Sequence, residues 1–247
     1  MDDRYTCHFP IANSDVDPFD RLRMSALFRL FEEASSAHTE QLGVGRNRLD
    51  GLSVLWVLSR MAVSIRRPPM RGESVTLATW PGKTRRTIFP RHYVLQDAGG
   101  APLVRGVALW LLMDRETRRM AFPEKLGLSV DGLELPGALP SPGPLNLPPL
   151  PQIAERTARF SELDLNGHLN NTKYLDWMED LLPLSYHASH FWSQIQINYA
   201  LEIRPDTAVT LSYAPPQGNE PLFLQGASGE TRFFEVRATP GLWPMDR

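Results

Sequence analysis

An internal repeat constrains the fold of this chain more than any other feature of its sequence. Residues 15–24, DVDPFDRLRM, align with residues 162–171, ELDLNGHLNN, so that acidic residues and one leucine match. The segments that follow, LFRLFEE at 27–33 and YLDWMED at 174–180, align in the same register. A third match pairs VTLATWP at 75–81 with VTLSYAP at 209–215. Because such self-similarity marks repeated structural units, we expect two copies of one fold.

Each copy is expected to combine one long helix with several strands. An apolar face predicts the first helix over residues 25–42, ending at Gly43, and a similar stripe predicts the second over 172–182. One long helix for each antiparallel sheet indicates an α+β fold in which the sheet wraps the helix. The expected strands cover residues 53–66, 73–81, 87–97 and 102–113 in the first copy and 155–163, 191–203, 207–214, 221–227 and 231–238 in the second.

A segment rich in proline and glycine separates the two copies. Residues 123–151 include LPG at 135–137 and PSPGP at 140–144. Such a composition disfavours helices and interior strands, so we interpret this segment as a semi-rigid connector. The expected domains are therefore residues 1–122 and 152–247, with the linker at 123–151.

The second copy carries a polar set that the first copy lacks. Asp164, Asn166 and His168 alternate along the chain, so an extended backbone would place their side chains on one face. A helix beginning near Asn170 or Asn171 would add free backbone N–H groups at the same place. Asn-Gly is also a turn signal, and either asparagine equally suits a helix N-cap.

The first copy replaces these polar residues while keeping the surrounding pattern. Phe19 stands opposite Asn166, and Arg21 stands opposite His168. When the register of the third match is extended toward the N-terminus, Pro68 falls opposite Glu202. This selective divergence favours chemistry in the second copy.

Composition bounds the class of protein. The 247 residues are 42% hydrophobic and 22% charged, as in ordinary globular proteins. A net charge of -2 argues against a general nucleic-acid binder. The single cysteine, Cys7, cannot form an intramolecular disulfide, and no apolar run is long enough for a membrane span. The start of the chain shows no signal-peptide pattern, so we expect a cytoplasmic location.

Several motifs together resemble a known enzyme family. They are NGHLNNTKY at 166–174, WVLSR at 56–60, TWP at 79–81 and DRETRR at 114–119. With the doubled layout, they make the chain similar to the acyl-acyl carrier protein (acyl-ACP) thioesterases. This resemblance implies two tandem hotdog domains, each a long helix wrapped by an antiparallel sheet. It also implies hydrolysis of the thioester between a fatty acyl chain and the phosphopantetheine arm of acyl carrier protein.

The resemblance further implies a catalytic set of Asp164, Asn166, His168 and Glu202. Many family members have cysteine directly after this glutamate, but Ile203 stands here, so a cysteine–histidine mechanism is unavailable. We expect Glu202 or Asp164 to activate water, with an acyl-enzyme on either carboxylate left open. His168 would handle the proton, Asn166 would hold water or the carbonyl, and the N–H groups at the start of the second helix would stabilise the oxyanion. No metal ion or other cofactor is expected.

The first copy is implied to shape the acyl-chain tunnel, and acyl carrier protein is the implied partner. The substrate-binding candidates are Leu27, Phe31, Leu55, Val57, Trp110, Asn170 and Asn171. Because acyl carrier protein is acidic, a basic docking surface is expected. Its candidates are Arg66, Arg67, Arg85 and Arg86.

Other functions remain open from the sequence. An acyl-coenzyme A thioesterase would use similar chemistry on another carrier, and a hotdog dehydratase would act on β-hydroxyacyl chains. A non-catalytic acyl-binding hotdog module is the alternative of a different class, because a fold does not fix a function. The tandem layout makes a monomer feasible, and a homodimer is equally open.

Overall fold

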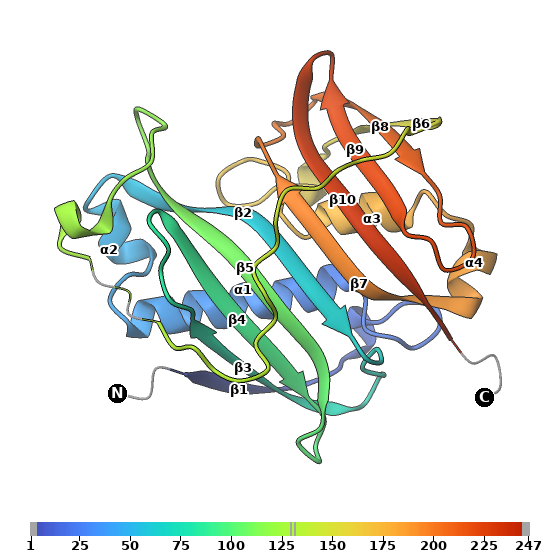
Figure 1. Cartoon of the computed structure of the whole chain (residues 1–247), viewed down its shortest axis with the longest axis horizontal. Coiled ribbons are helices and arrows are strands. Elements are labelled where there is room, and N and C mark those ends of the chain that lie inside the picture. Colours follow the sequence, from blue (N-terminus) through green and yellow to red (C-terminus); the bar gives the residue numbers. More distant parts are fainter. Residues whose placement is uncertain (1–3, 129, 131, 244–247) are drawn as a thin grey trace.

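The computed structural model describes residues 4–128, 130 and 132–243, and one antiparallel sheet runs through the whole of it (Figure 1). The sheet has ten strands in the order β1-β3-β4-β5-β2-β7-β10-β9-β8-β6. The first half of the chain contributes β1 (Tyr5–Pro10), β2 (Val54–Ile65), β3 (Ser74–Pro81), β4 (Ile88–Gln96) and β5 (Pro102–Asp114). The second half contributes β6 (Gln152–Thr157), β7 (His190–Tyr199), β8 (Ala208–Ala214), β9 (Leu222–Ser228) and β10 (Thr231–Leu242).

The helices lie on one face of this sheet (Figure 1). In the first half, α1 (Met24–Gln41) runs behind the strands and is followed by the short α2 (Arg46–Asp50). In the second half, α3 (Lys173–Glu179) and α4 (Leu184–Ser189) take the corresponding place. Within the described residues there are also three short 3-10 helices: η1 (Asn13–Asp15), η2 (Pro123–Leu126) and η3 (Phe160–Glu162). The predicted α+β class is confirmed.

The predicted strands of the first half are confirmed to within one residue, whereas four predictions in the second half have a wrong limit. Strand β7 ends four residues before the expected limit at 203, and β10 continues four residues beyond the expected limit at 238. The strand expected at 155–163 is β6, which ends at Thr157 and gives way to η3. The helix expected over 172–182 ends at Glu179. Pro183 explains this early end, because proline has no N–H and its ring clashes with the carbonyl four residues earlier, that of Glu179. The second half therefore has a broken helix in place of a long one.

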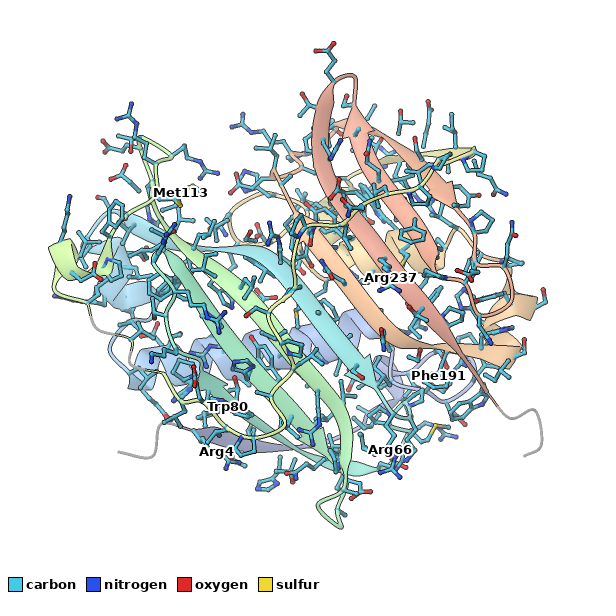
Figure 2. The ribbon with its side chains drawn as sticks, viewed as in Figure 1. Arg4, Arg66, Trp80, Met113, Phe191 and Arg237 are labelled. Carbon is cyan, nitrogen blue, oxygen red and sulfur yellow. The ribbon has the colours of Figure 1, made fainter. Side chains whose placement is uncertain are left out.

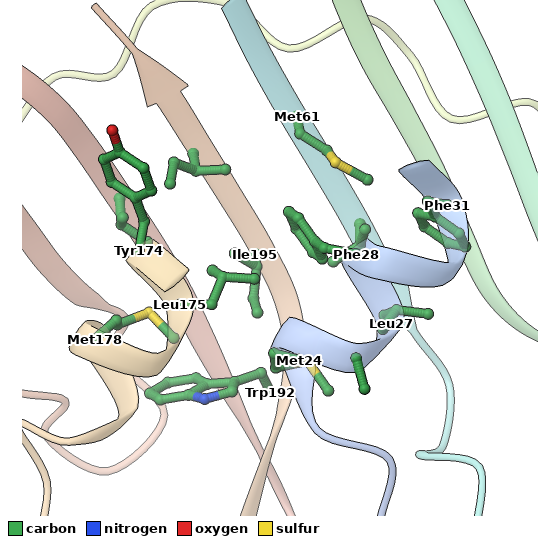
Figure 3. Packing of buried hydrophobic residues seen from close by; sticks show 14 of the residues in the cluster. Met24, Leu27, Phe28, Phe31, Met61, Tyr174, Leu175, Met178, Trp192 and Ile195 are labelled. Carbon is green, nitrogen blue, oxygen red and sulfur yellow. The ribbon is translucent and has the colours of Figure 1, made fainter. Parts of the chain in front are cut away.

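The pairing of β2 with β7 joins the two halves. These strands pair antiparallel from Arg60 opposite Asn198 to Ser64 opposite Gln194. The side chains that point toward the helices at this seam are almost completely buried: Met61, Val63, Ile195 and Ile197. Figure 3 shows Met61 and Ile195 beside Phe28 of α1 and Leu175 of α3. One hydrophobic core therefore extends across both halves.

The proline-rich linker crosses the opposite face of the sheet (Figure 1). Arg105 of β5 donates to the Gly137 carbonyl at 2.8 Å, and Gln196 of β7 donates to the Gly143 carbonyl at 2.7 Å. Side chains from both halves thus hold the linker in place. The two halves share one sheet and one core, so the structure shows no physical separation between them. The domain limits at residues 122 and 152 therefore stay a prediction.

Glu179 of α3 lies where the second half meets the first. Its surroundings include Arg21 and Asp17 from the first half and Trp192 of β7. Burial, with the negative charges of Asp176 and Asp17 adding to it, raises the pKa of the Glu179 carboxyl to about 8. The folded protein therefore keeps this carboxyl protonated at neutral pH.

The seam should carry a large share of the stability. Ile197 is 0% exposed, so Ile197→Ala leaves a cavity between the halves and should lower the free energy of unfolding by about 2–5 kcal/mol. The matched control is Ile153→Ala on the edge strand β6, where the side chain is 70% exposed; its effect should stay within about 0.5 kcal/mol. Denaturant unfolding measures both, and equal effects would contradict a shared core.

Glu179 should make stability depend on pH. Between pH 4.5, the ordinary carboxyl value, and about pH 8 the folded chain binds more protons here than the unfolded chain. The free energy of unfolding contributed by this group therefore falls as the pH rises through that window. Glu179→Gln removes this contribution. The free energy of unfolding of the variant, relative to that of the wild type, should therefore rise by more than about 1 kcal/mol from pH 5 to pH 8.

Denaturant unfolding at both pH values measures this difference. Asp180→Asn is the matched control, because Asp180 is exposed and holds only a surface ion pair with Arg156. A Glu179→Gln variant that tracks the wild type at both pH values would contradict the burial of a protonated carboxyl.

Candidate active site

A tight turn in the second half presents the polar motif. Leu163 and Leu169 form an isolated antiparallel bridge, and the five residues between them reverse the chain. One oxygen of the Asp164 carboxylate accepts the backbone N–H groups of Asn166 at 2.8 Å and His168 at 3.1 Å. Gly167 adopts φ 76°, a left-handed conformation that glycine reaches without strain. The expected extended segment is therefore wrong, because the carboxylate folds the backbone around itself.

The first half repeats this turn almost atom for atom. Asp17 accepts the N–H groups of Phe19 at 2.8 Å and Arg21 at 3.0 Å. Asp20 has φ 64° at the place of Gly167, and Val16 bridges Leu22 as Leu163 bridges Leu169. The repeated aspartate therefore has the same structural task in both halves, which is to hold the turn.

Glu202 reaches the turn from a loop. Strand β7 ends at Tyr199, so the expected strand at 191–203 is four residues too long at this end. The Leu169 N–H donates to the Ile203 carbonyl at 2.8 Å, which brings the loop against the turn. As a result, Glu202 Oε2 lies 3.6 Å from His168 Nε2. The structure thus brings together the predicted histidine and glutamate.

Arg118 of the first half completes this arrangement, and sequence reasoning did not assign it. Its Nη2 donates to Glu202 Oε2 at 2.6 Å. Arg118 sits in the turn after β5, where Asp114 accepts the Thr117 N–H at 2.7 Å. The DRETRR motif at 114–119 was visible in the sequence, but only the fold places it beside the second half. Arg118, Glu202 and His168 therefore form a chain of charged and polar groups across the junction.

A cavity of about 230 Å³ opens beside the turn. Within the described residues, Asn166 is the contribution of the second half to its lining, and all other lining residues come from before residue 131. Its apolar wall includes Val44, Leu49, Leu55, Phe89 and Trp110. The polar turn of one half therefore borders a largely apolar hollow in the other half.

Polar groups occupy part of the same cavity. Arg91 of β4 lines it while being only 4% exposed. Its guanidinium lies 3.1 Å from His38 Nδ1, and burial lowers the pKa of Arg91. An apolar ligand in the cavity would offer the Arg91 guanidinium no further hydrogen-bond acceptor.

The predicted tunnel residues divide between the cavity and the core. Leu55 and Trp110 line the cavity. Phe31 stacks on Tyr93 with ring centroids 4.3 Å apart and borders a smaller void that Asn171 also lines. Leu27 is fully buried in the core under the sheet (Figure 3), and Val57 lies half-buried on β2 outside the cavity lining. Leu27 and Val57 therefore do not contribute to the cavity wall.

The start of α3 is occupied by Asn170. Its side-chain oxygen accepts the Thr172 N–H at 2.9 Å and the Thr172 hydroxyl at 2.7 Å. Its carbonyl accepts the Lys173 N–H at 2.9 Å. The backbone N–H groups of Thr172 and Lys173 are therefore already hydrogen-bonded and are not free to bind an oxyanion. For these two groups, the expected oxyanion site at the start of the second helix is wrong. The N-cap position of α3 is Thr172, so Asn170 holds the turn just before the helix instead of capping it.

The structure separates the predicted docking arginines into two pairs. Arg66 and Arg67 follow the end of β2, whose last residue, Ile65, pairs with Val104 near the start of β5. Arg85 and Arg86 lie in the exposed β3–β4 turn, close to the other end of β5. Figure 2 labels Arg66 at one end of the strands and Met113 at the other. The cavity and Arg118 lie at the Met113 end, together with Arg85 and Arg86.

The described part of the chain holds neither a cluster of metal ligands nor a membrane-spanning helix. No group of three or more histidine, cysteine, aspartate or glutamate side chains is arranged to hold a metal ion in that part of the chain. Across the same residues, every helix is too short or too polar to cross a membrane.

Comparison with solved structures identifies the architecture. An acyl-ACP thioesterase from Bacteroides thetaiotaomicron superposes with a TM-score of 0.88 at 21% identity, covering 97% of this chain and 98% of that one. The 12:0-ACP thioesterase from Umbellularia californica gives 0.83 at 22% identity, covering 97% and 98%. These likenesses confirm the predicted tandem hotdog fold.

Sequence relatives point to the same family. A dodecanoyl-[acyl-carrier-protein] hydrolase of Cinnamomum camphora is 26% identical over 231 residues, which cover 85% of this chain and 60% of the relative. A palmitoyl-acyl carrier protein thioesterase of Gossypium hirsutum is 28% identical over 230 residues, which cover 83% and 53%. The chain thus spans little more than half of these relatives.

The family models cover most of the chain. The model of the acyl-ACP thioesterase N-terminal domain matches residues 2–124, and that of the C-terminal domain matches residues 151–230. Their limits fall close to the ends of the proline-rich linker. The chain belongs to the acyl-ACP thioesterase family.

Proposed function

We propose that this protein hydrolyses the thioester between a fatty acyl chain and acyl carrier protein. The observation that carries this proposal is the junction between the halves. There, Asn166 opens into the apolar cavity while His168 Nε2 lies 3.6 Å from Glu202. An acyl chain in the cavity would bring its carbonyl carbon beside these groups.

Each polar group has a defined task in this reaction. The Asn166 amide donates to the thioester carbonyl oxygen, on which negative charge develops as water attacks. Glu202, fixed by Arg118, orients the His168 ring, and His168 delivers a proton to the departing sulfur. A carboxylate of the site takes the proton of water. Acid–base assistance of this kind contributes about 10²–10⁴-fold to a rate.

The arginines of the β3–β4 turn support acyl carrier protein as the carrier of the acyl chain. Arg85 and Arg86 are exposed, and no ion pair links either of them to an acidic residue in the described part of the chain. Free cations at the cavity end suit an acidic protein partner. We also propose that the protein is cytoplasmic and acts as a monomer or a homodimer. The β2–β7 pairing already supplies two hotdog units within one chain.

Product analysis tests the function directly. The purified chain is incubated with acyl-ACP and with acyl-coenzyme A of several lengths, and released fatty acids are measured by mass spectrometry. Faster release from acyl-ACP supports the proposal. Faster release from acyl-coenzyme A would assign the carrier differently, and bound fatty acid without turnover would identify a binding module.

Single substitutions test the site. His168→Ala, Asn166→Ala and Glu202→Gln should each lower kcat/KM for acyl-ACP by about 10²-fold or more, because each removes a group that acts on the transition state. His8→Ala on β1 is the control, since this exposed histidine bonds Thr76 far from the turn. If all three site variants matched the His8→Ala variant, the assignment would be wrong.

Charge reversal tests carrier docking. Arg85→Glu with Arg86→Glu should raise KM for acyl-ACP about 10-fold, leave kcat unchanged and weaken the dependence of KM on salt. The same reversal at Arg66 and Arg67, at the far end of the sheet, is the matched control. Equal changes in the two double variants would show that the carrier does not dock at the β3–β4 turn.

A further inference from the structure

Glu32 of α1 lies at a meeting point of three hollows. It lines the main cavity together with Asn166 and the small void together with Asn171. It also borders a groove that Asn170 lines on the other side. A residue of the first half thus faces the catalytic turn of the second half. The next residue, Glu33, points to solvent and pairs with Arg29 at 2.8 Å.

The Glu32 carboxyl lacks a compensating cation. In the described part of the chain, no hydrogen bond or ion pair is recorded for its side chain, and the nearby charges that act on it are those of Asp164 and Glu33. Tyr93 of β4 and Tyr199 of β7 face it from the sheet. Burial first, and then the charge of Asp164, raises the pKa of Glu32.

The internal repeat supplies a comparison within the same molecule. Glu32 aligns with Glu179, and each glutamate faces the aspartate turn of the opposite half. Around Glu179, however, Trp192 supplies a hydrogen bond and Arg21 supplies a positive charge. In the second half His168 replaces Arg21, so Glu32 faces the catalytic turn without that cation. A carboxyl left uncompensated in a cavity is a candidate for chemistry.

The other two carboxylates of the site are already engaged. Asp164 holds the turn through two backbone N–H groups, as Asp17 does in the half without a catalytic set. Glu202 is held by the Arg118 guanidinium at 2.6 Å. Of the three, Glu32 combines access to the cavity with freedom from any partner.

We propose that Glu32 is the general base of the hydrolysis, supplied by the first half to the turn of the second. This inference rests on the proposed thioesterase function and names the group that activates water. The Glu32 carboxylate accepts one proton of water as the oxygen bonds to the thioester carbonyl carbon. When the carbon–sulfur bond breaks, that proton passes through His168 to the thiolate, and the hydroxyl stays on the fatty acid.

The test compares Glu32→Gln with two matched variants. Glu33→Gln changes the exposed neighbour on the same helix, and Glu179→Gln changes the repeat equivalent outside the site. We expect Glu32→Gln to lower kcat for acyl-ACP by about 10²–10⁴-fold while KM stays within about threefold. Both controls should keep kcat within about threefold, and circular dichroism should show the same fold in all variants.

The pH profile separates a base from a structural residue. Because only the ionised carboxylate accepts a proton, wild-type kcat should fall toward low pH with a midpoint above the ordinary carboxyl value of 4.5. This limb should vanish in Glu32→Gln. Glu32→Asp, which keeps the acid but withdraws it by one carbon, should retain the limb with a lower kcat.

Each outcome decides the inference. If Glu32→Gln keeps kcat within about threefold while the wild type hydrolyses acyl-ACP, Glu32 is not the base and the proposed function stands. If Glu32→Gln fails to fold, a Glu32→Asp variant with undiminished kcat overturns the inference. A wild-type chain that releases fatty acid from no acyl thioester overturns both the inference and the proposed function.

Discussion

The pairing of β2 with β7 is the interaction on which the rest of the molecule depends. It turns two groups of five strands into one sheet and places α1 and α3 side by side over one core. Each half then completes the other: Asn166 closes a cavity built by the first half, and Arg118 reaches Glu202 in the second. The site exists only at this junction, because neither half contains both the hollow and the polar turn.

The two copies show how one backbone supports two purposes. Both turns hold an aspartate that accepts the N–H groups two and four residues ahead. In the first half Arg21 is buried and donates to the carbonyls of His187 and His190, which binds the turn to the second half. In the second half His168 occupies the matching place and meets Glu202. The same scaffold thus stabilises the junction on one side and brings His168 against Glu202 on the other.

The sequence predictions were accurate where periodicity dominates and failed where the backbone bends. Strands β2 to β5 follow clear apolar patterns, and their limits were right to within one residue. The helix of the second half was predicted too long because its apolar stripe continues to Leu182, whereas Pro183 ends the hydrogen-bonding pattern at Glu179. The motif at 164–168 was taken as extended because alternation alone does not reveal the turn that Asp164 imposes.

The sequence by itself determined the doubled α+β fold and the family, because repeats, periodicity and motifs can be read along the chain. The association of His168 with Glu202 was implied by the family resemblance. Only the tertiary structure decided that Arg118 meets Glu202, that Glu32 lines the cavity beside Asn166 and that Leu27 belongs to the core. These placements depend on contacts between residues far apart in sequence, and the pairing of β2 with β7 creates those contacts. Apolar residues look alike in a sequence, and only packing shows which of them border a cavity.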